Sequence, residues 1–262
     1  LRKELLSPQS PEVAHVYKEI GNAYIKQSDH NQGEQYTLMA LELYQAITTE
    51  HQTEIADCLY NLGAVYKMKN EFSVALKYFR RVYKLIIEHL GERHINTAKN
   101  LSALGVIYAD LGDFDRAVSY NKRAITVYES TVGRRHPHVA TTLYNLGINH
   151  IFKGEQHKAL DYLDQALSIQ RDVFGERHSE TADTIYVISV VYSRLGDHEA
   201  ALSYLKEALS INREIFGDQH PNTAILLNSI GSMYIRKGDF DRALEYIQKA
   251  LTIDQRTLGE RH

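Results

Sequence analysis

The sequence predicts an all-α solenoid of about six helix-turn-helix repeats, because three residue patterns recur with a fixed period of 42 residues. The first is a Gly-x-x-Tyr motif that begins at Gly21, Gly63, Gly105, Gly147, Ser189 and Gly231, with His150 at the tyrosine position of the fourth copy. The second is an alanine, found at Ala14, Ala56, Ala98, Ala140, Ala182 and Ala224. The third is a Gly-x-x-His motif that ends at His94, His136, His178, His220 and His262. In a stacked array each unit contacts only its neighbours, so function is expected on the surface.

The third repeat shows how one unit is expected to fold. Apolar residues at helical spacing predict a first helix over Ile95–Leu111. Gly112 suits the left-handed position that ends a helix, and Asp113 can cap the second helix, predicted from about residue 113 to residue 131. The same pair recurs as Gly154-Glu155, Gly196-Asp197 and Gly238-Asp239, with Asn70 at the glycine position of repeat two.

Two further columns of small residues mark where helices are expected to approach closely. One contains Ala75, Ala117, Ala159, Ala201 and Ala243, and the other contains Ala40, Ala124, Ala166, Ala208 and Ala250, with Val82 as the exception. Leucine in place of Ala117 is expected to overpack its contact at a cost of about 1–3 kcal/mol. Repeat one is the least regular, with Gly33 in the first column and Gln52 at the histidine position.

Composition and charge narrow the class of protein. The formal net charge of −3 predicts no general attraction to nucleic acid. No apolar run reaches the roughly 18 residues that a membrane-spanning helix needs, so no membrane insertion is expected, and no signal-peptide pattern occurs. The single cysteine, Cys58, fits a reducing compartment and is expected to be a buried thiol rather than a nucleophile. The predicted location is the cytoplasm.

No pattern of catalytic or metal-binding residues stands out. The recurring histidines fall once per repeat, and neighbouring helices pack about 10 Å apart, whereas zinc needs its nitrogen ligands at about 2.1 Å. They are therefore expected to be turn residues that pack or form hydrogen bonds. His150 is expected to be partly buried and hydrogen-bonded. No phosphate-binding loop, nucleophile elbow or spaced Cys/His pair occurs, so no enzyme activity, cofactor or metal is expected.

The repeat resembles the tetratricopeptide repeat in its Leu104-Gly105-Val106-Ile107-Tyr108 and Gly112-Asp113-Phe114-Asp115-Arg116-Ala117 segments. That repeat usually has about 34 residues. The longer unit here, with turns such as Gly217-Asp218-Gln219-His220-Pro221-Asn222-Thr223-Ala224, resembles the repeats of kinesin light chains and of relatives such as nephrocystin-3 and bacterial and protist repeat proteins. The resemblance covers residues 10 to 262 and implies a right-handed α-solenoid.

The expected domain organisation is a single solenoid over residues 1–262. Its repeats are expected at about 10–51, 52–93, 94–135, 136–177, 178–219 and 220–262. Residues 1–9 occupy the register of the tail of a preceding repeat, because Ser10-Pro11-Glu12-Val13-Ala14 matches the later repeat junctions. The chain is therefore expected to be part of a longer protein.

The resemblance also implies a binding surface, because in this family the first helix of each repeat lines a concave groove. Fixed offsets from the motif glycine place ten residues there: Tyr60, Asn61, Val106, Tyr144, Asn145, Ile148, Phe152, Tyr186, Val190 and Arg194. Seven of these residues form an apolar stripe edged by tyrosines, which is typical of contact surfaces: Tyr60, Val106, Tyr144, Ile148, Phe152, Tyr186 and Val190. The prediction is a groove for an extended peptide or an amphipathic helix. The alternative is a narrower superhelix in which these residues pack against each other or an adjacent segment.

The predicted function is a non-enzymatic protein-interaction scaffold, and its most specific form is a cargo adaptor of the kinesin-light-chain type. The Leu-x-Asn-Leu motif that the resemblance links to cargo binding occurs only at residues 59–62 and 143–146. The family's preference for acidic peptides is therefore not carried over to this chain. One alternative is a regulatory or sensory array attached to a signalling or catalytic domain. Another is a scaffold that assembles with itself end to end.

Overall fold

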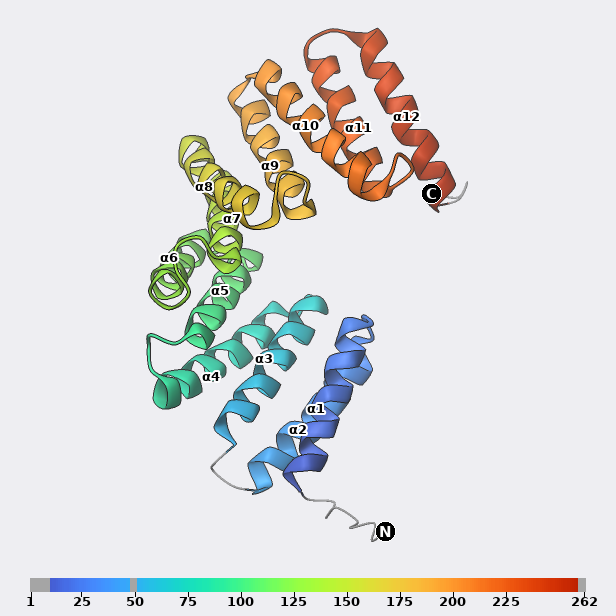
Figure 1. The fold of residues 1–262 in the computed structure, drawn as a ribbon. Helices are drawn as coiled ribbons and strands as arrows, with labels where there is room; N and C mark the ends of the chain where they lie inside the picture. The colour runs from blue at the N-terminus through green and yellow to red at the C-terminus, as the bar shows by residue number, and fades with distance from the viewer. Residues whose placement is uncertain (1–9, 48–50, 259–262) are drawn as a thin grey trace. The chain divides into compact units, whose positions relative to one another are not determined.

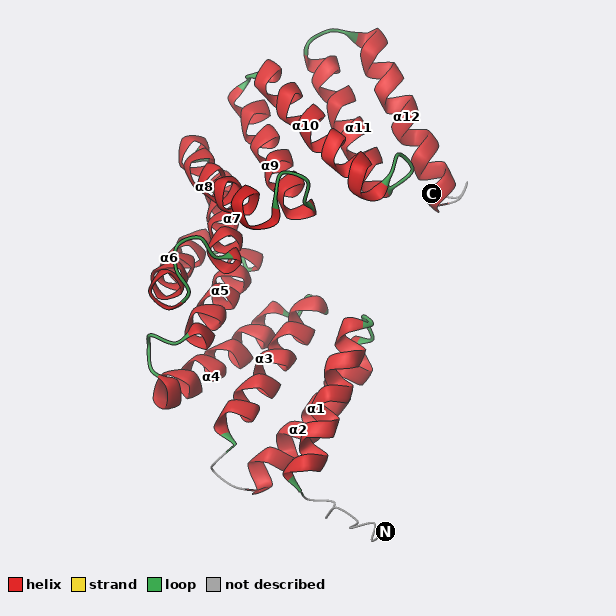
Figure 2. Ribbon diagram, viewed as in Figure 1, coloured by secondary structure: helices red, strands yellow, loops and turns green. Residues whose placement is uncertain are grey.

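The computed structural model describes residues 10–47 and 51–258, and within these ranges it contains α-helices and no strands (Figure 2). The all-α prediction is confirmed. Successive helices form the hairpins of the repeats. They are α1 (Pro11–Lys26) and α2 (His30–Ile47), α3 (Gln52–Met68) and α4 (Phe72–Leu90), α5 (Ile95–Asp110) and α6 (Phe114–Thr131), α7 (Pro137–Phe152) and α8 (Gln156–Phe174), α9 (Ser179–Leu195) and α10 (His198–Phe216), and α11 (Pro221–Arg236) and α12 (Phe240–Leu258).

The helices group into two compact units, residues 1–132 and residues 133–262. Unit 1 contains α1 to α6, coloured blue to green in Figure 1, and unit 2 contains α7 to α12, coloured yellow-green to red. Within each unit the second helix of a repeat also packs against the first helix of the next, as α2 does against α3 and α10 against α11. The single solenoid over the whole chain stays a prediction.

The turn inside each hairpin forms as predicted. Gly112 has a φ of +78°, and Asn70 replaces glycine in repeat two with a φ of +60°. The backbone N–H of Arg116 donates to Asp113 Oδ1 over 3.1 Å, which caps α6. Glu155 occupies the same column in the fourth repeat but makes no side-chain cap to α8.

The turn between repeats is closed by the recurring histidine. The Nδ1 atoms of His94, His136, His178 and His220 each accept a hydrogen bond from the backbone N–H two residues later, over 3.1 to 3.2 Å. This bond satisfies one of the free N–H groups at the start of the next helix. The prediction of structural turn histidines is confirmed for these four, and His262 lies outside the described residues.

Close helix approach explains the small-residue columns. Ala75, Ala117, Ala159 and Ala201 are all fully buried. A Cβ atom added to Gly147 would lie 2.6 Å from Leu163 Cγ on the partner helix of the hairpin, so only glycine fits there without a shift.

The tyrosine of the Gly-x-x-Tyr motif packs inside its own hairpin. The rings of Tyr66 and Tyr78 stack with their centroids 5.4 Å apart, and Tyr108 and Tyr120 stack at 5.2 Å. In the fourth repeat His150 keeps this place, 5.2 Å from the Tyr162 ring, and its Nδ1 lies 2.7 Å from Glu155 Oε2. The prediction of a hydrogen-bonded histidine is confirmed, and the ring is buried rather than partly buried as expected, with only 4% of the residue exposed.

Candidate binding surface

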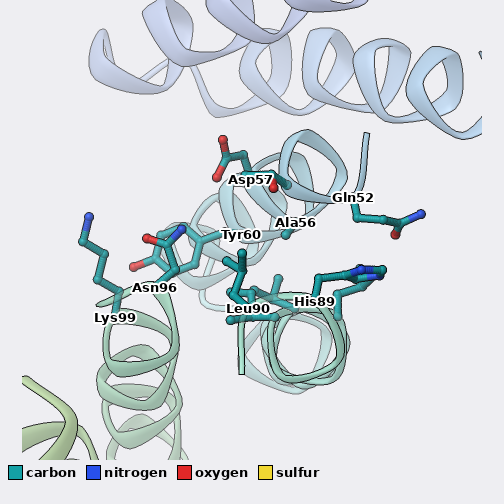
Figure 3. Close-up of a pocket in the computed structure, with 12 residues that line it drawn as sticks. Gln52, Ala56, Asp57, Tyr60, His89, Leu90, Asn96 and Lys99 are labelled. Atoms are coloured by element: carbon teal, nitrogen blue, oxygen red, sulfur yellow. The ribbon is translucent and has the colours of Figure 1, made fainter. Parts of the chain in front are cut away.

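In unit 1, α3, α4 and α5 enclose a pocket of about 180 Å³ (Figure 3). Its apolar wall is formed mainly by side chains of α4, among them Val82, Leu85 and Ile86. Figure 3 shows Asn96 and Lys99 on α5, with His89 and Leu90 on α4. The pocket therefore has an apolar interior with a polar rim, which is the usual composition of a ligand site.

The rim of the unit 1 pocket carries opposite charges. Lys18 Nζ lies 3.6 Å from Asp57 Oδ2, so the aspartate already has a cationic neighbour within the chain. Burial raises the pKa of the Asp57 carboxyl, although the Lys18 cation opposes this shift. Lys99 is exposed and makes no ion pair with a described residue. It leaves a positive charge available at the rim.

Two of the predicted groove residues lie on α3 of this unit. Tyr60 lines the pocket, and its ring meets the Phe79 ring edge-on at 5.2 Å. Burial raises the pKa of the Tyr60 phenol. Asn61 Nδ2 donates to Asn22 Oδ1 over 2.6 Å, so its side chain links two repeats in the unbound molecule. A partner that binds Asn61 would have to share or replace this bond.

In unit 2, α9 and α11 border a surface hollow of about 250 Å³, with Leu205 of α10 contributing to its wall. Three predicted groove residues, Tyr186, Val190 and Arg194, meet there. The remaining lining residues are Ser189, Ser193, Ser229, Ser232, Met233 and Arg236.

Hydrogen bonds within the chain determine which donors and acceptors of this hollow are free to bind a partner. The hydroxyls of Ser229 and Ser232 donate to the carbonyls of Ile225 and Asn228 within α11, over 2.9 and 3.0 Å. They therefore face a partner mainly as acceptors. Arg194 Nη1 donates to the Ile151 carbonyl over 3.3 Å, which leaves the other N–H groups of its guanidinium available. The two arginines make the hollow suited to a carboxylate beside an apolar group.

The other predicted groove residues lie outside both cavities. Val106 is half-buried on α5, and Asn145 is half-buried on α7. Tyr144 and Ile148 are partly buried against the hydrophobic core of unit 2, and Phe152 at the end of α7 is exposed. The ten residues are thus divided between the two units, and one continuous groove stays a prediction.

The second helices also contribute side chains to the unit 1 pocket, which the sequence pattern did not predict. Leu85, His89 and Leu90 of α4 line the unit 1 pocket, although only first-helix positions were expected at the binding surface. One sequence pattern could have indicated that the ends of the second helices contribute apolar side chains. The column of Leu90 contains Phe174 and Phe216 in later repeats, where each ring stacks on the capping histidine at 4.5 Å.

A family model for the tetratricopeptide repeat matches residues 12–88, 75–130, 96–172, 140–214 and 180–256. These matches cover nearly all of the described helices. The chain belongs to the tetratricopeptide-repeat family. No protein among curated sequences matches it.

Solved structures show which tetratricopeptide-repeat arrays it is similar to. BtubC (BKLC) from P. vanneervenii is 18% identical with a TM-score of 0.77, and the match covers 89% of this chain and 93% of that chain. Nearly identical repeats from a kinesin-light-chain candidate of Podosopora anserina are 18% identical with a TM-score of 0.69, covering 82% and 100%. The apo form of RapI is 16% identical with a TM-score of 0.71, covering 96% and 86%. The array is therefore of the kinesin-light-chain type in fold.

In the described part of this tetratricopeptide-repeat chain, no group of three or more His, Cys, Asp or Glu side chains could hold a metal ion. None of the described helices is long and apolar enough to cross a membrane. Cys58 is fully buried, as predicted, and burial raises the pKa of its thiol to about 12, so it is a poor nucleophile in the folded chain.

Proposed function

We propose that the chain is a non-enzymatic scaffold that binds a peptide or a helical partner on its first-helix face. The observation that supports this proposal is the pair of cavities, one in each unit, because Tyr60 lines the first and Tyr186, Val190 and Arg194 line the second. Each has apolar walls and at least one cation, Lys99 beside Asp57 in unit 1 and Arg194 with Arg236 in unit 2. The most specific form is a cargo adaptor like a kinesin light chain.

A regulatory array is the second candidate function. A structure similar over 97% of this chain, with a TM-score of 0.65 and 16% identity, is the Rap conjugation gene regulator of plasmid pLS20 in complex with the Phr* peptide. This likeness supports peptide binding by the same kind of array. Both functions require a peptide to bind the first-helix face, so one experiment tests what they share.

The experiment selects ligands from a random peptide library displayed on phage, with the 262-residue chain immobilised. We expect enriched peptides with large apolar residues next to carboxylates, because each cavity joins an apolar wall to at least one cation. Synthetic versions are then titrated by calorimetry against Tyr60→Ala in unit 1 and Arg236→Glu in unit 2. At least one variant should weaken binding by about tenfold or more, which corresponds to about 1.4 kcal/mol.

The controls are Lys122→Ala on α6 and Ser168→Ala on α8, which change exposed residues of second helices. They should leave the affinity unchanged. Circular dichroism of all four variants confirms that the helices remain folded. Peptides that bind all four variants as tightly as the parent chain would show that the cavities are not the binding surface.

A further inference from the structure

Helix α4 in unit 1 carries four exposed cations, at spacings of three and four residues that bring side chains to one broad side of a helix: Lys77, Arg80, Arg81 and Lys84. Lys84 Nζ lies 3.9 Å from Glu88 Oε1, and both side chains are exposed. The other three cations make no ion pair with a described residue. This side of α4 is therefore strongly positive, although the whole chain has a formal net charge of −3.

Tyrosines, and not carboxylates, hold the arginines of this surface in place. Arg80 Nη2 donates to the Tyr108 hydroxyl over 2.5 Å. Arg123 of α6 donates from Nη2 to the Tyr83 hydroxyl over 2.6 Å, and its Cζ lies 5.6 Å from the centres of both the Tyr83 and the Tyr120 rings. The Tyr108 and Tyr120 rings stack at 5.2 Å, so both arginines belong to one cluster. A phenol is neutral, so each guanidinium keeps its charge and its other N–H groups for a partner.

Paired cations at these positions are specific to repeats two and three. The two columns contain Arg80-Arg81 in repeat two and Lys122-Arg123 in repeat three. In the other repeats they contain Leu38-Met39, Asp164-Gln165, Lys206-Glu207 and Gln248-Lys249. Hairpin packing does not require the paired cations, because the other repeats form the same hairpin without them.

A cavity of about 180 Å³ lies beside Arg123, among side chains of α4, α5 and α6. Leu101 and Val127 form its apolar wall, and Tyr83 and Arg123 also line it. Glu92 is the acidic residue of the lining, and it is exposed to solvent. The cavity therefore offers a place for one apolar side chain next to a fixed cation.

We propose that α4, α5 and α6 form a second binding surface, which takes a segment of a partner protein with an apolar side chain followed by a run of carboxylates. The apolar side chain enters the cavity beside Arg123, and the carboxylates pair with Arg123 and with the cations of α4. Guanidinium groups suit this partner because they bind carboxylates through two parallel hydrogen bonds. The surface is built from second helices and does not depend on the first-helix face.

The same observations disfavour nucleic acid as the partner. Single-stranded nucleic acid binds basic surfaces by stacking its bases on aromatic rings. Here the Tyr108 and Tyr120 rings stack on each other, and Arg123 contacts the Tyr83 and Tyr120 rings. Nucleic acid also has no aliphatic side chain to fill the cavity. RNA therefore serves as the competing polyanion in the test.

Fluorescence polarisation tests the proposal with a labelled synthetic peptide that contains a leucine followed by a run of glutamates. We expect the 262-residue chain to bind this peptide. Arg80→Gln and Arg123→Gln should each raise the dissociation constant about threefold to fivefold, as expected for exposed ion pairs. The double variant should show a larger loss than either single variant. A peptide with glutamines in place of the glutamates should not bind, and one with alanine in place of the leucine should bind more weakly.

The matched control is Lys206→Gln on α10. Lys206 occupies the column of Arg80, and each cation lies 5.9 Å from the centre of a tyrosine ring, Tyr234 and Tyr108 respectively. Its neighbour, however, is the acidic Glu207. This variant should bind the peptide like the parent chain, and so should Arg236→Glu, which changes the first-helix hollow of unit 2. Circular dichroism should show unchanged helix content in every variant.

Four results would overturn the proposal. The first is a parent chain that does not bind the peptide, and the second is a double variant that binds it as tightly as the parent. The third is an equal loss in Lys206→Gln or Arg236→Glu, which would indicate general charge attraction or binding at the first-helix face. The fourth is a single-stranded RNA that binds more tightly than the peptide and loses affinity in the same arginine variants, which would assign the surface to nucleic acid.

Discussion

Asn121 of α6 occupies a position at which repeats two, four, five and six have apolar side chains and repeat one has Thr37. Asn121 is fully buried. Neither the Nδ2 nor the Oδ1 atom of its side-chain amide has a hydrogen-bond partner among the described residues. The column contains Phe79, Leu163, Leu205 and Ile247 in other repeats. Leucine fits beside Gly147 in the fourth repeat, and the matching neighbour of Asn121 is likewise a glycine, Gly105. We therefore predict that Asn121→Leu stabilises the chain.

The magnitude follows from two contributions. An unpaired amide buried in the protein costs about 1–3 kcal/mol, and a buried leucine side chain contributes about 1.5–3 kcal/mol relative to an exposed one. Part of this gain is lost to imperfect fit, since added volume in a packed site has a cost of its own. We expect a net gain of about 2 kcal/mol in the free energy of unfolding.

Urea denaturation followed by circular dichroism measures this gain as a higher midpoint with an unchanged slope. Asn121→Ala serves as the comparison, because it also removes the amide but leaves a cavity that offsets the benefit. It should be less stable than Asn121→Leu. A lower midpoint for Asn121→Leu than for the parent chain would refute the reasoning, since it would show that the amide is well hydrogen-bonded in solution.

Three further predictions concern the turns, the helix contacts and the buried thiol. His220→Ala should lower the free energy of unfolding by about 1 kcal/mol in urea denaturation because α11 loses its cap, whereas His220→Asn, which can cap, should retain most of the stability. Gly147→Ala should destabilise by about 1–3 kcal/mol in the same assay, because its Cβ would collide with Leu163; an unchanged midpoint would contradict the close approach. Cys58 should not react with a thiol reagent at pH 8 until the chain is unfolded. The pKa of the Cys58 thiol in the folded chain, about 12, lies above its ordinary value of 9.0. The buried, neutral thiol therefore makes its full contribution to the free energy of unfolding below pH 9, and this contribution is lost as the pH rises from 9 towards 12.

Sequence periodicity predicted the features that depend on the backbone. The left-handed turn at Gly112 and the cap from Asp113 follow from the conformational preferences of glycine and aspartate alone, and both occur. The capping role of His94 was harder to predict, because histidine is not among the preferred capping residues. Only the geometry of the turn places its Nδ1 within reach of the next helix.

The candidate site was predictable to a lesser extent. Tyr60 and Val190 line cavities because their helix positions point to the expected face. Whether a cavity opens there depends on the size of side chains from a different helix, such as Leu90 of α4. The size of these second-helix side chains can be read by comparing equivalent positions between repeats, but not from the sequences of the first helices. The buried amide of Asn121 was missed for the same reason.

The ring stacks inside the hairpins also determine how this molecule can be observed. The chain has 18 tyrosines and no tryptophan, and within the described residues stacks occur at Tyr24–Tyr36, Tyr66–Tyr78, Tyr108–Tyr120, His150–Tyr162, Tyr192–Tyr204 and Tyr234–Tyr246. Near-ultraviolet dichroism therefore reports the summed closure of the hairpins, and the fourth hairpin contributes one tyrosine to its stack where the others contribute two. A single tryptophan introduced at Tyr78 or Tyr246 would make one chosen repeat visible by fluorescence against a background that contains no other indole.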